Sequence, residues 1–148
     1  MADEQKEVAK MIDAGSLIVP GAELDPDRMP PLRAGQSTKA MERRVERFYF
    51  SVGAIFEAWV KRRPSPHTRR AYRQDVEALI AYLKFDWPKE STEMLAVSVA
   101  DVMEWRDSLE AAGMAPKTIN RRISSVSSFY KYLQAVAAEM RLPIVVPN

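Results

Sequence analysis

Apolar residues between Pro116 and Leu133 recur at intervals of three and four positions, which is the spacing of one face of an α-helix. This apolar stripe consists of Ile119, Ile123, Val126, Tyr130 and Leu133. The opposite face is basic and rich in short hydroxyl side chains, and it holds Lys117, Arg121, Ser124, Ser125, Ser128 and Lys131. Solvated helix faces usually mix both signs of charge, yet no acidic residue occurs between Glu110 and Glu139. The pattern therefore predicts a helix whose outer face approaches a polyanion.

A longer apolar-periodic segment runs from about Ser37 to Arg62, and we expect it to be the main hydrophobic partner of the other helices. Its apolar residues are Val45, Phe48, Tyr49, Val52, Ile55, Phe56, Trp59 and Val60. Ser37 is a suitable N-cap, and a bend is expected near Gly53. The cations at residues 61–63 suit a helix C-terminus, because the helix dipole is negative there.

The next helix is expected over residues 66–85. Ser65 is a suitable N-cap, and Pro66 occupies the first helical position, where proline is well tolerated. The buried stripe of this helix is expected to contain Tyr72, Val76, Leu79, Ile80 and Leu83. Pro88 prevents its continuation, so residues 86–96 read as a loop.

A further helix is expected over residues 98–112, where Ser98 and Asp101 have the spacing of a capping box. Its apolar side is expected to hold Val99, Val102, Met103, part of Trp105, Leu109 and Ala112. Its outer side is mostly acidic, with Asp101, Glu104, Asp107 and Glu110. This helix is therefore a poor candidate for contact with nucleic acid, and Gly113 is expected to end it.

These elements predict an all-α domain, a four-helix bundle over residues 41–142. Residues 1–40 are interpreted as a largely flexible N-terminal extension. Within it, residues 2–14 fit either a short helix with Val8, Met11 and Ile12 on its apolar side or a frayed tail, whereas residues 15–36 have the glycine and proline content of a linker. Residues 143–148 read as an extended segment that begins another linker.

Composition narrows the classes of function. The 148 residues suffice for one domain with a hydrophobic core. The chain has no cysteine and one histidine, so it offers no disulfide, no thiolate nucleophile and no typical zinc site, and we expect no cofactor. No apolar run approaches the roughly 18 residues of a membrane span, and the N-terminus lacks the features of a secretory signal. We therefore expect a cytoplasmic protein that has no membrane partner.

Charge is distributed unevenly along the chain. Residues 1–36 carry four Lys or Arg and seven Asp or Glu, a net charge of −3, whereas residues 37–148 carry eighteen and thirteen, a net charge of +5. The stretch from Lys61 to Arg73 contains six basic residues and no acidic one. Such local clustering is better evidence for a nucleic-acid partner than the overall net charge of +2.

Two of the expected helices begin with similar sequences, S-P-H-T-R-R from Ser65 and A-P-K-T-I-N-R-R from Ala115. Each has a small residue, a proline, a basic-type residue, a threonine and then a pair of arginines, and the two prolines lie 50 residues apart. A helix N-terminus attracts anions because it has unpaired N–H donors and the positive end of the dipole. Basic residues there oppose the dipole by roughly 0.3–1 kcal/mol each, which indicates a use outside the helix. The alternative is that both are ordinary helix starts with solvated charges, in a non-catalytic helical protein-interaction module.

Three stretches in this order resemble the N-terminal core-binding domain of the phage-integrase, or tyrosine-recombinase, family. They are S-P-H-T-R-R-A-Y-R-Q-D-V-E-A-L-I-A-Y-L, S-V-A-D-V-M-E-W-R-D-S-L and P-K-T-I-N-R-R-I-S-S-V-S-S-F-Y-K-Y-L, and with the aromatic-rich helix before them they cover residues 45–148. The resemblance implies a compact four-helix SAM-like bundle that binds double-stranded DNA mainly through its second and fourth helices. It implies a role in DNA integration and site-specific recombination.

The same resemblance implies other recombinase protomers as partners, in a tetramer on DNA. It places the chemistry in a separate catalytic domain that supplies a nucleophilic tyrosine, and the linker to that domain would begin at residues 143–148. This chain contains no such arrangement of residues, so we expect no catalytic residue in it, and we interpret Tyr72 and Tyr130 as core residues.

The candidate DNA-binding residues come from the two similar helix starts and the first turns that follow them. They are His67, Thr68, Arg69, Arg70, Arg73, Gln74, Lys117, Thr118, Asn120, Arg121, Arg122 and Ser125. Those best suited to base edges are Arg70, Gln74, Asn120 and Arg121, because arginine and the side-chain amides can form paired hydrogen bonds with bases. The other basic residues and the hydroxyl groups are expected to hold phosphates.

Overall fold

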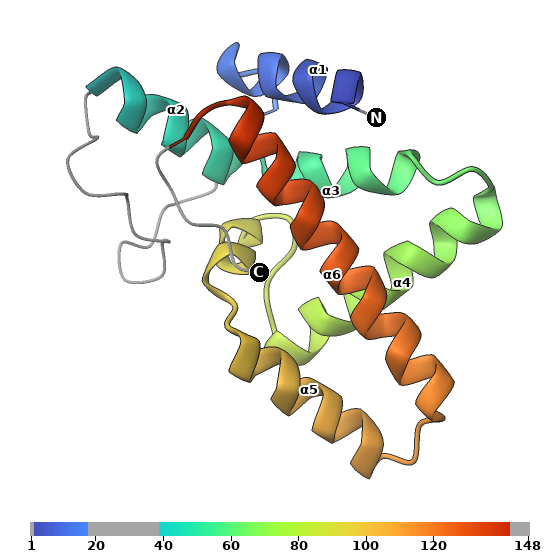
Figure 1. Ribbon diagram of the computed structural model, residues 1–148. Coiled ribbons are helices and arrows are strands. Elements are labelled where there is room, and N and C mark those ends of the chain that lie inside the picture. The colour runs from blue at the N-terminus through green and yellow to red at the C-terminus, as the bar shows by residue number, and fades with distance from the viewer. Residues whose placement is uncertain (1, 18–38, 143–148) are drawn as a thin grey trace.

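The computed structural model describes residues 2–17 and 39–142, and Figure 1 shows the arrangement of their helices. The elements are α1 (Ala2–Asp13), α2 (Lys39–Phe50), α3 (Val52–Lys61), α4 (Pro66–Leu83), a 3-10 helix η2 (Ser91–Ala96), α5 (Val99–Ala111) and α6 (Pro116–Glu139). None of these described residues forms a strand. The predicted all-α fold is confirmed.

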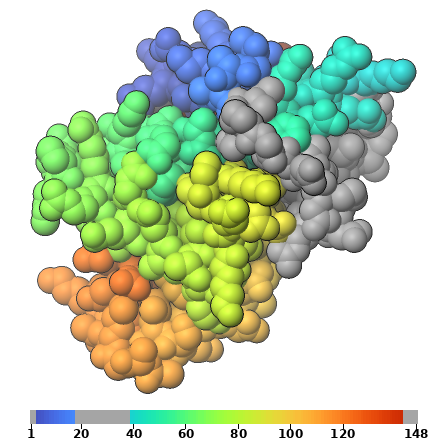
Figure 2. Space-filling model, turned by 180° about the vertical axis from the view of Figure 1, so that it is seen from behind, coloured from blue at the N-terminus to red at the C-terminus, as the bar shows by residue number. Residues whose placement is uncertain are grey.

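The longest helix, α6, is the central element of the fold. It packs against α1, α3, α4 and α5, and it crosses α4 near the middle of the molecule (Figure 1). In the view from behind, η2 lies near the middle of that face and the red C-terminal part of α6 is hidden, so that part of α6 lies on the opposite face (Figure 2). The helix continues six residues beyond the predicted Leu133, because Val136 and Ala137 are also buried.

Aromatic side chains fill the centre of the core where α3 meets α6. The rings of Phe56, Trp59 and Phe129 are buried, with centroids 5.4–6.0 Å apart. The Trp59 Nε1–H group donates a hydrogen bond to Ser128 Oγ at 3.2 Å, which satisfies the one polar atom of the buried indole. Ser128 therefore faces the core partner α3 rather than lying on the outer face of α6, where the sequence pattern placed it.

The predicted helix over residues 37–62 is divided into α2 and α3 at Ser51, two residues before the expected bend at Gly53. The Ser51 hydroxyl donates to the Arg47 carbonyl at 2.6 Å, so the side chain satisfies a carbonyl where the helix is interrupted. Gly53 has a different role. A Cβ atom there would lie 3.1 Å from Pro88 Cβ, so its absence allows the segment before η2 to pack closely on α3.

Residues 2–17 are not a frayed tail, because α1 packs on α2 and α6 through Val8, Ala9 and Ile12. Two ion pairs fasten it: Asp13 Oδ1 lies 2.9 Å from Arg44 Nε, and Glu4 Oε2 lies 2.8 Å from Arg62 Nε. Tertiary packing thus stabilises a helix that would be marginal alone. The expected N-cap Ser37, the glycine- and proline-rich stretch over residues 18–38, and the linker segment over residues 143–148 lie outside the described residues.

The segment predicted as a loop over residues 86–96 contains η2, which buries Met94 and Leu95. The following helix, α5, begins with the predicted Ser98–Asp101 capping box and is followed by Gly113 at φ +81°, as expected for a glycine just past a helix end. Its packing differs from prediction, because Trp105 is fully buried whereas Val99 and Met103 are exposed.

Candidate DNA-binding surface

A buried carboxylate joins the two helices that the sequence singled out. Asp75 lies on α4 with 1% of its surface exposed. Its Oδ1 accepts a hydrogen bond from Arg121 Nη2 at 2.8 Å, and its Oδ2 accepts from Arg121 Nε at 3.2 Å and from Ser125 Oγ at 2.7 Å. A buried charge is tolerated when it is paired and hydrogen-bonded in this way. Asp75 therefore fixes the contact between α4 and α6.

Arg121 belongs both to this contact and to the surface. Its side chain is 53% exposed, although one edge of the guanidinium is held by Asp75. The hydrogen bonds that Arg121 donates to Asp75 raise the pKa of Arg121, so its guanidinium stays cationic. The pairing also brings Arg121 beside the third turn of α4, where the exposed Gln74 precedes Asp75.

The exposed polar face of α6 matches the sequence pattern in most of its members. This α6 polar stripe consists of Lys117, Asn120, Arg121, Ser124 and Lys131, all exposed and none acidic. The predicted outward position of Ser125 is wrong, because only 2% of the residue is exposed and its hydroxyl is used by Asp75. The buried face of α6 is wider than its apolar stripe, because a serine can be buried when a carboxylate accepts a hydrogen bond from its hydroxyl group.

The first turns of α4 form a second exposed polar stripe. This α4 polar stripe consists of His67, Arg70 and Gln74, and it is followed on the same side by the exposed acid Glu77. Arg69 is also exposed, and its Nε donates to the Arg63 carbonyl at 3.0 Å, which orients it over the connection between α3 and α4. The basic character of α4 is thus confined to its N-terminal half.

Several cations of the Lys61–Arg73 cluster are held by internal partners. Arg73 donates from Nη1 and Nη2 to the two carboxylate oxygens of Glu57, at 2.8 and 2.5 Å. This hydrogen bond raises the pKa of Arg73 and lowers the pKa of Glu57. The guanidinium of Arg63 lies 4.9 Å from the Tyr72 ring centroid, and that of Arg62 lies 4.9 Å from the Tyr132 ring centroid. These three arginines stabilise the fold.

The two similar helix starts differ in their capping. At the start of α4, Ser65 Oγ accepts from the Thr68 N–H at 3.1 Å and lies 2.8 Å from the Thr68 hydroxyl. At the start of α6, Ala115 provides no side-chain cap. The Thr118 N–H donates instead to the Ala115 carbonyl at 3.0 Å, and Pro116 has no N–H, so the Lys117 N–H is the group at this helix start that an anion could bind. Beside it, Thr118 and Arg122 are half-buried.

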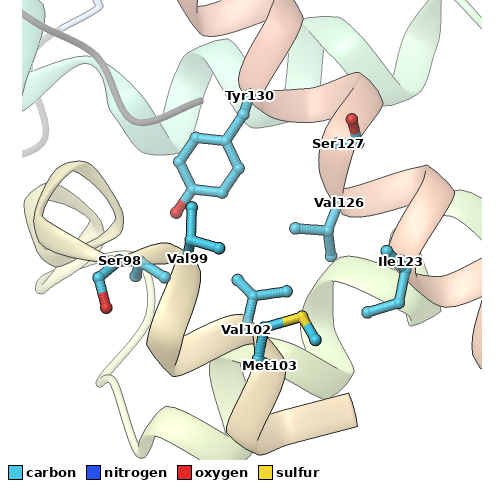
Figure 3. A pocket seen from close by; sticks show the side chains of 9 residues that line it. Ser98, Val99, Val102, Met103, Ile123, Val126, Ser127 and Tyr130 are labelled. Carbon is cyan, nitrogen blue, oxygen red and sulfur yellow. The ribbon is translucent and has the colours of Figure 1, made fainter.

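An apolar groove lies between the start of α5 and the middle of α6 (Figure 3). Its volume is about 240 Å³, and its lining includes Val99, Val102, Met103, Ile123 and Val126. Tyr130 borders the groove, but its hydroxyl donates to the Met94 carbonyl, and burial raises its pKa. Tyr130 is thus a core residue, as predicted, and Tyr72 is half-buried against Trp59.

Residues 2–17 and 39–142 differ from proteins with two other kinds of site, a metal centre and a membrane-spanning helix. No group of three or more His, Asp or Glu side chains is arranged there to hold a metal ion. None of the helices in this part of the chain is both long and apolar enough to cross a membrane.

Comparison with known proteins gives a consistent result. The chain is 34% identical to the tyrosine recombinase XerC of Lacticaseibacillus casei over 84 residues, which cover 57% of this chain and 28% of that protein. It is 37% identical to XerC of Chlorobaculum parvum over 75 residues (49% and 22%) and 31% identical to a tyrosine recombinase of Synechococcus elongatus over 78 residues (46% and 23%). No solved structure matched significantly.

The matched segments thus span about a quarter of the length of these curated relatives. A family profile described as "Phage integrase, N-terminal SAM-like domain" matches residues 57–136, from α3 through most of α6. That range includes both polar stripes and the Asp75–Arg121 contact. The chain therefore belongs to the phage-integrase, or tyrosine-recombinase, family, of which it carries the N-terminal SAM-like domain.

Proposed function

We propose that this chain binds double-stranded DNA in a sequence-specific manner, as the core-binding domain of a site-specific tyrosine recombinase. The observation that carries the proposal is the crossing of α4 and α6, where two exposed polar stripes are joined by Arg121 and Asp75. The α6 polar stripe contains three cations and no acid, and a single-sign surface of this kind attracts the phosphate backbone.

The size and shape of its side chains make α6 a better candidate than α4 for entering the major groove of DNA. The major groove of B-DNA admits an α-helix, and short side chains such as that of Ser124 let the helix backbone come near the bases. Asn120 and Arg121 can pair with adenine and guanine edges, respectively. On α4, Arg70 and Gln74 offer the same chemistry, so these four residues are proposed to read bases.

Fewer residues are proposed to contact phosphates than the sequence pattern indicated. Lys117 and Arg69 are exposed cations next to helix starts, and the backbone N–H of Lys117 adds one donor at the start of α6. His67, Thr68, Thr118 and Arg122 lie at or near the same two helix starts and belong to the proposed surface. Arg73 and Ser125 are left out, because Glu57 and Asp75 engage their polar groups.

The test is DNA binding by fluorescence anisotropy across a series of salt concentrations, with a duplex selected from a random library. If about five phosphates are neutralised, log K falls with log salt at a slope of about −4 to −5. Arg70→Ala should weaken binding about tenfold, the loss expected of one good base contact. The matched control is Arg106→Ala on the acidic outer side of α5, which should bind as the wild type does. A slope near zero would contradict the proposal.

We also propose a role for this domain within a longer recombinase. The relatives are named tyrosine recombinases, so we propose that this domain holds a core DNA site while a catalytic domain elsewhere in the protein cuts and rejoins strands. Other recombinase protomers, in a tetramer on DNA, are the proposed protein partners. We propose a cytoplasmic location as well, since these relatives are bacterial proteins and bacterial DNA lies in the cytoplasm.

The alternative is a non-catalytic helical protein-interaction module whose basic faces are merely solvated. The apolar groove between α5 and α6, with Val99 66% exposed, is the observation that favours it. Such a module would show no DNA affinity at moderate salt and no effect of Arg70→Ala. The same anisotropy series therefore distinguishes the two functions.

A further inference from the structure

We propose that Asp75 is a positioning residue for DNA reading: it fixes the Arg121 guanidinium so that Arg121 recognises one base pair. This inference rests on the proposed DNA-binding function. Asp75 itself cannot touch DNA, because it is 1% exposed and lies under the crossing of α4 and α6. Its effect on recognition is exerted through the orientation of Arg121.

The hydrogen-bond geometry leaves the reading edge of Arg121 available. Four of the five N–H groups of arginine form two forks: a side edge, Nε with Nη2, and a distal edge, Nη1 with Nη2. Asp75 engages the side edge, through Nε at 3.2 Å and Nη2 at 2.8 Å. The distal edge still offers a pair of parallel donors, which can bind guanine O6 and N7 together. Pairing with Asp75 thus orients the arginine without occupying that edge.

Ser125 makes the orientation more definite. Its hydroxyl donates to Asp75 Oδ2 at 2.7 Å, so each carboxylate oxygen has at least one fixed donor and the carboxylate cannot rotate freely. Both residues are buried, which confines them to one arrangement. Arg121 is therefore ordered before DNA arrives, and the entropy loss that normally accompanies ordering an arginine on binding is reduced.

The negative charge of Asp75 also changes what Arg121 contributes. It offsets the positive charge of Arg121, so the arginine adds less to the general attraction for phosphate than an unpaired cation would. The hydrogen-bonding fork remains, so the pair favours base discrimination over non-specific affinity. An arginine without such a partner is free to bind a nearby phosphate instead of a base.

A second pair in the same chain provides an internal control. Glu57 binds Arg73 through Nη1 and Nη2, which is the distal edge, and the Arg73 guanidinium lies 5.5 Å from the Phe56 ring centroid. An arginine held in this way has its reading edge occupied. The two pairs contain the same chemical groups, but only the Asp75–Arg121 pair presents the distal edge, so Glu57→Gln is a matched control for Asp75→Asn.

The experiment compares full-length chains on the selected duplex and on single-base-pair variants of it, again by anisotropy. In the wild type, substitution of one base pair should lower affinity by about five- to a hundredfold, the discrimination of one bidentate arginine contact. In Asp75→Asn that discrimination should fall several-fold at that base pair and nowhere else, while affinity for a mixed-sequence duplex is kept or rises slightly. Glu57→Gln should leave every base preference unchanged.

Arg121→Lys is the second variant, and it keeps the inference testable if Asp75→Asn does not fold. It retains the charge but loses the fork, so the same base preference should disappear while the salt slope stays the same. Unchanged base preference in either folded variant would overturn the inference. A wild type that binds DNA without any base preference at this position would also overturn it, whereas a wild type that does not bind DNA would instead overturn the proposed function.

Discussion

Two basic regions of this chain differ in what their charges do. The Lys61–Arg73 cluster has six cations and no acid, and by sequence it is the denser one. In the structure, three of those six are held by Glu4, Glu57 and aromatic rings. On α6 three of the four cations are exposed, Lys117, Arg121 and Lys131, although Asp75 holds one edge of Arg121. Charge density along a sequence therefore does not measure charge available to a partner.

The largest expected effect concerns the contact between Asp75 on α4 and Arg121 on α6. Arg121→Ala removes the charge partner of Asp75 and leaves a buried carboxylate with Ser125 alone. We expect it to lower the free energy of unfolding by roughly 2–3 kcal/mol, because an unpaired buried charge is costly. Urea unfolding followed by circular dichroism measures this. Adding Asp75→Asn to Arg121→Ala should restore most of the loss, and a single-variant loss below about 0.5 kcal/mol would contradict the account.

The second prediction separates structural from available cations. Arg63→Ala should lower the free energy of unfolding by about 1 kcal/mol, because Arg63 lies over the Tyr72 and Trp59 rings. Its DNA affinity, measured below the unfolding transition, should equal that of the wild type. Arg70→Ala should do the reverse, weakening DNA binding while the unfolding curve is unchanged. If Arg63→Ala weakens binding as much as Arg70→Ala, the two regions do not differ as described.

The third prediction uses the difference in capping between the two helix starts. Ala115→Ser supplies the missing N-cap of α6, and it should raise the free energy of unfolding by about 0.5–1 kcal/mol. If the Lys117 N–H binds phosphate, the same substitution should weaken DNA binding slightly, since an N-cap serine accepts from the N–H groups of the second and third helical residues. Ser65→Ala should lower stability by a similar amount, because it removes an existing cap. Equal DNA affinity of Ala115→Ser and wild type would exclude that phosphate contact.

The smallest expected effect is the pH dependence of the Glu57–Arg73 pair. Arg73 lowers the pKa of Glu57 below its ordinary value of 4.5, so the pair stabilises the folded state above that pH. This stabilisation is lost as the pH falls through the lowered pKa. Both side chains are partly exposed, so Glu57→Gln should reduce stability by only about 0.5 kcal/mol at neutral pH. The difference from wild type should vanish in acid; a difference that grows in acid would contradict this assignment.

The sequence predicted the helices whose signals are local. The N-cap Ser65 with Pro66, the Ser98–Asp101 capping box and the stop at Gly113 are confirmed, because each depends only on neighbouring residues. It did not predict the division at Ser51 or the packing of α1, because both depend on elements distant in the chain. Nor did it predict that Trp105, rather than Val99 or Met103, anchors α5.

The sequence predicted most of the exposed residues of the candidate surface, but it did not predict the contact between α4 and α6. Periodicity identified Lys117, Arg121 and Ser124 as outward residues, since a helix face can be read from spacing alone. Asp75 was missed, although its position between Tyr72 and Leu79 on the apolar stripe of α4 was a usable signal. An acid on a buried stripe requires a partner, and only the crossing of α4 and α6 shows that the partner is Arg121.

The most direct test of the difference between the two regions is the salt dependence of DNA binding, compared for wild type, Lys117→Ala and Arg63→Ala on one selected duplex. The account predicts a wild-type slope of log K against log salt of about −4 to −5, a slope about one unit shallower for Lys117→Ala, and an unchanged slope for Arg63→Ala. A slope near zero in the wild type, or a shallower slope for Arg63→Ala but not for Lys117→Ala, would contradict it.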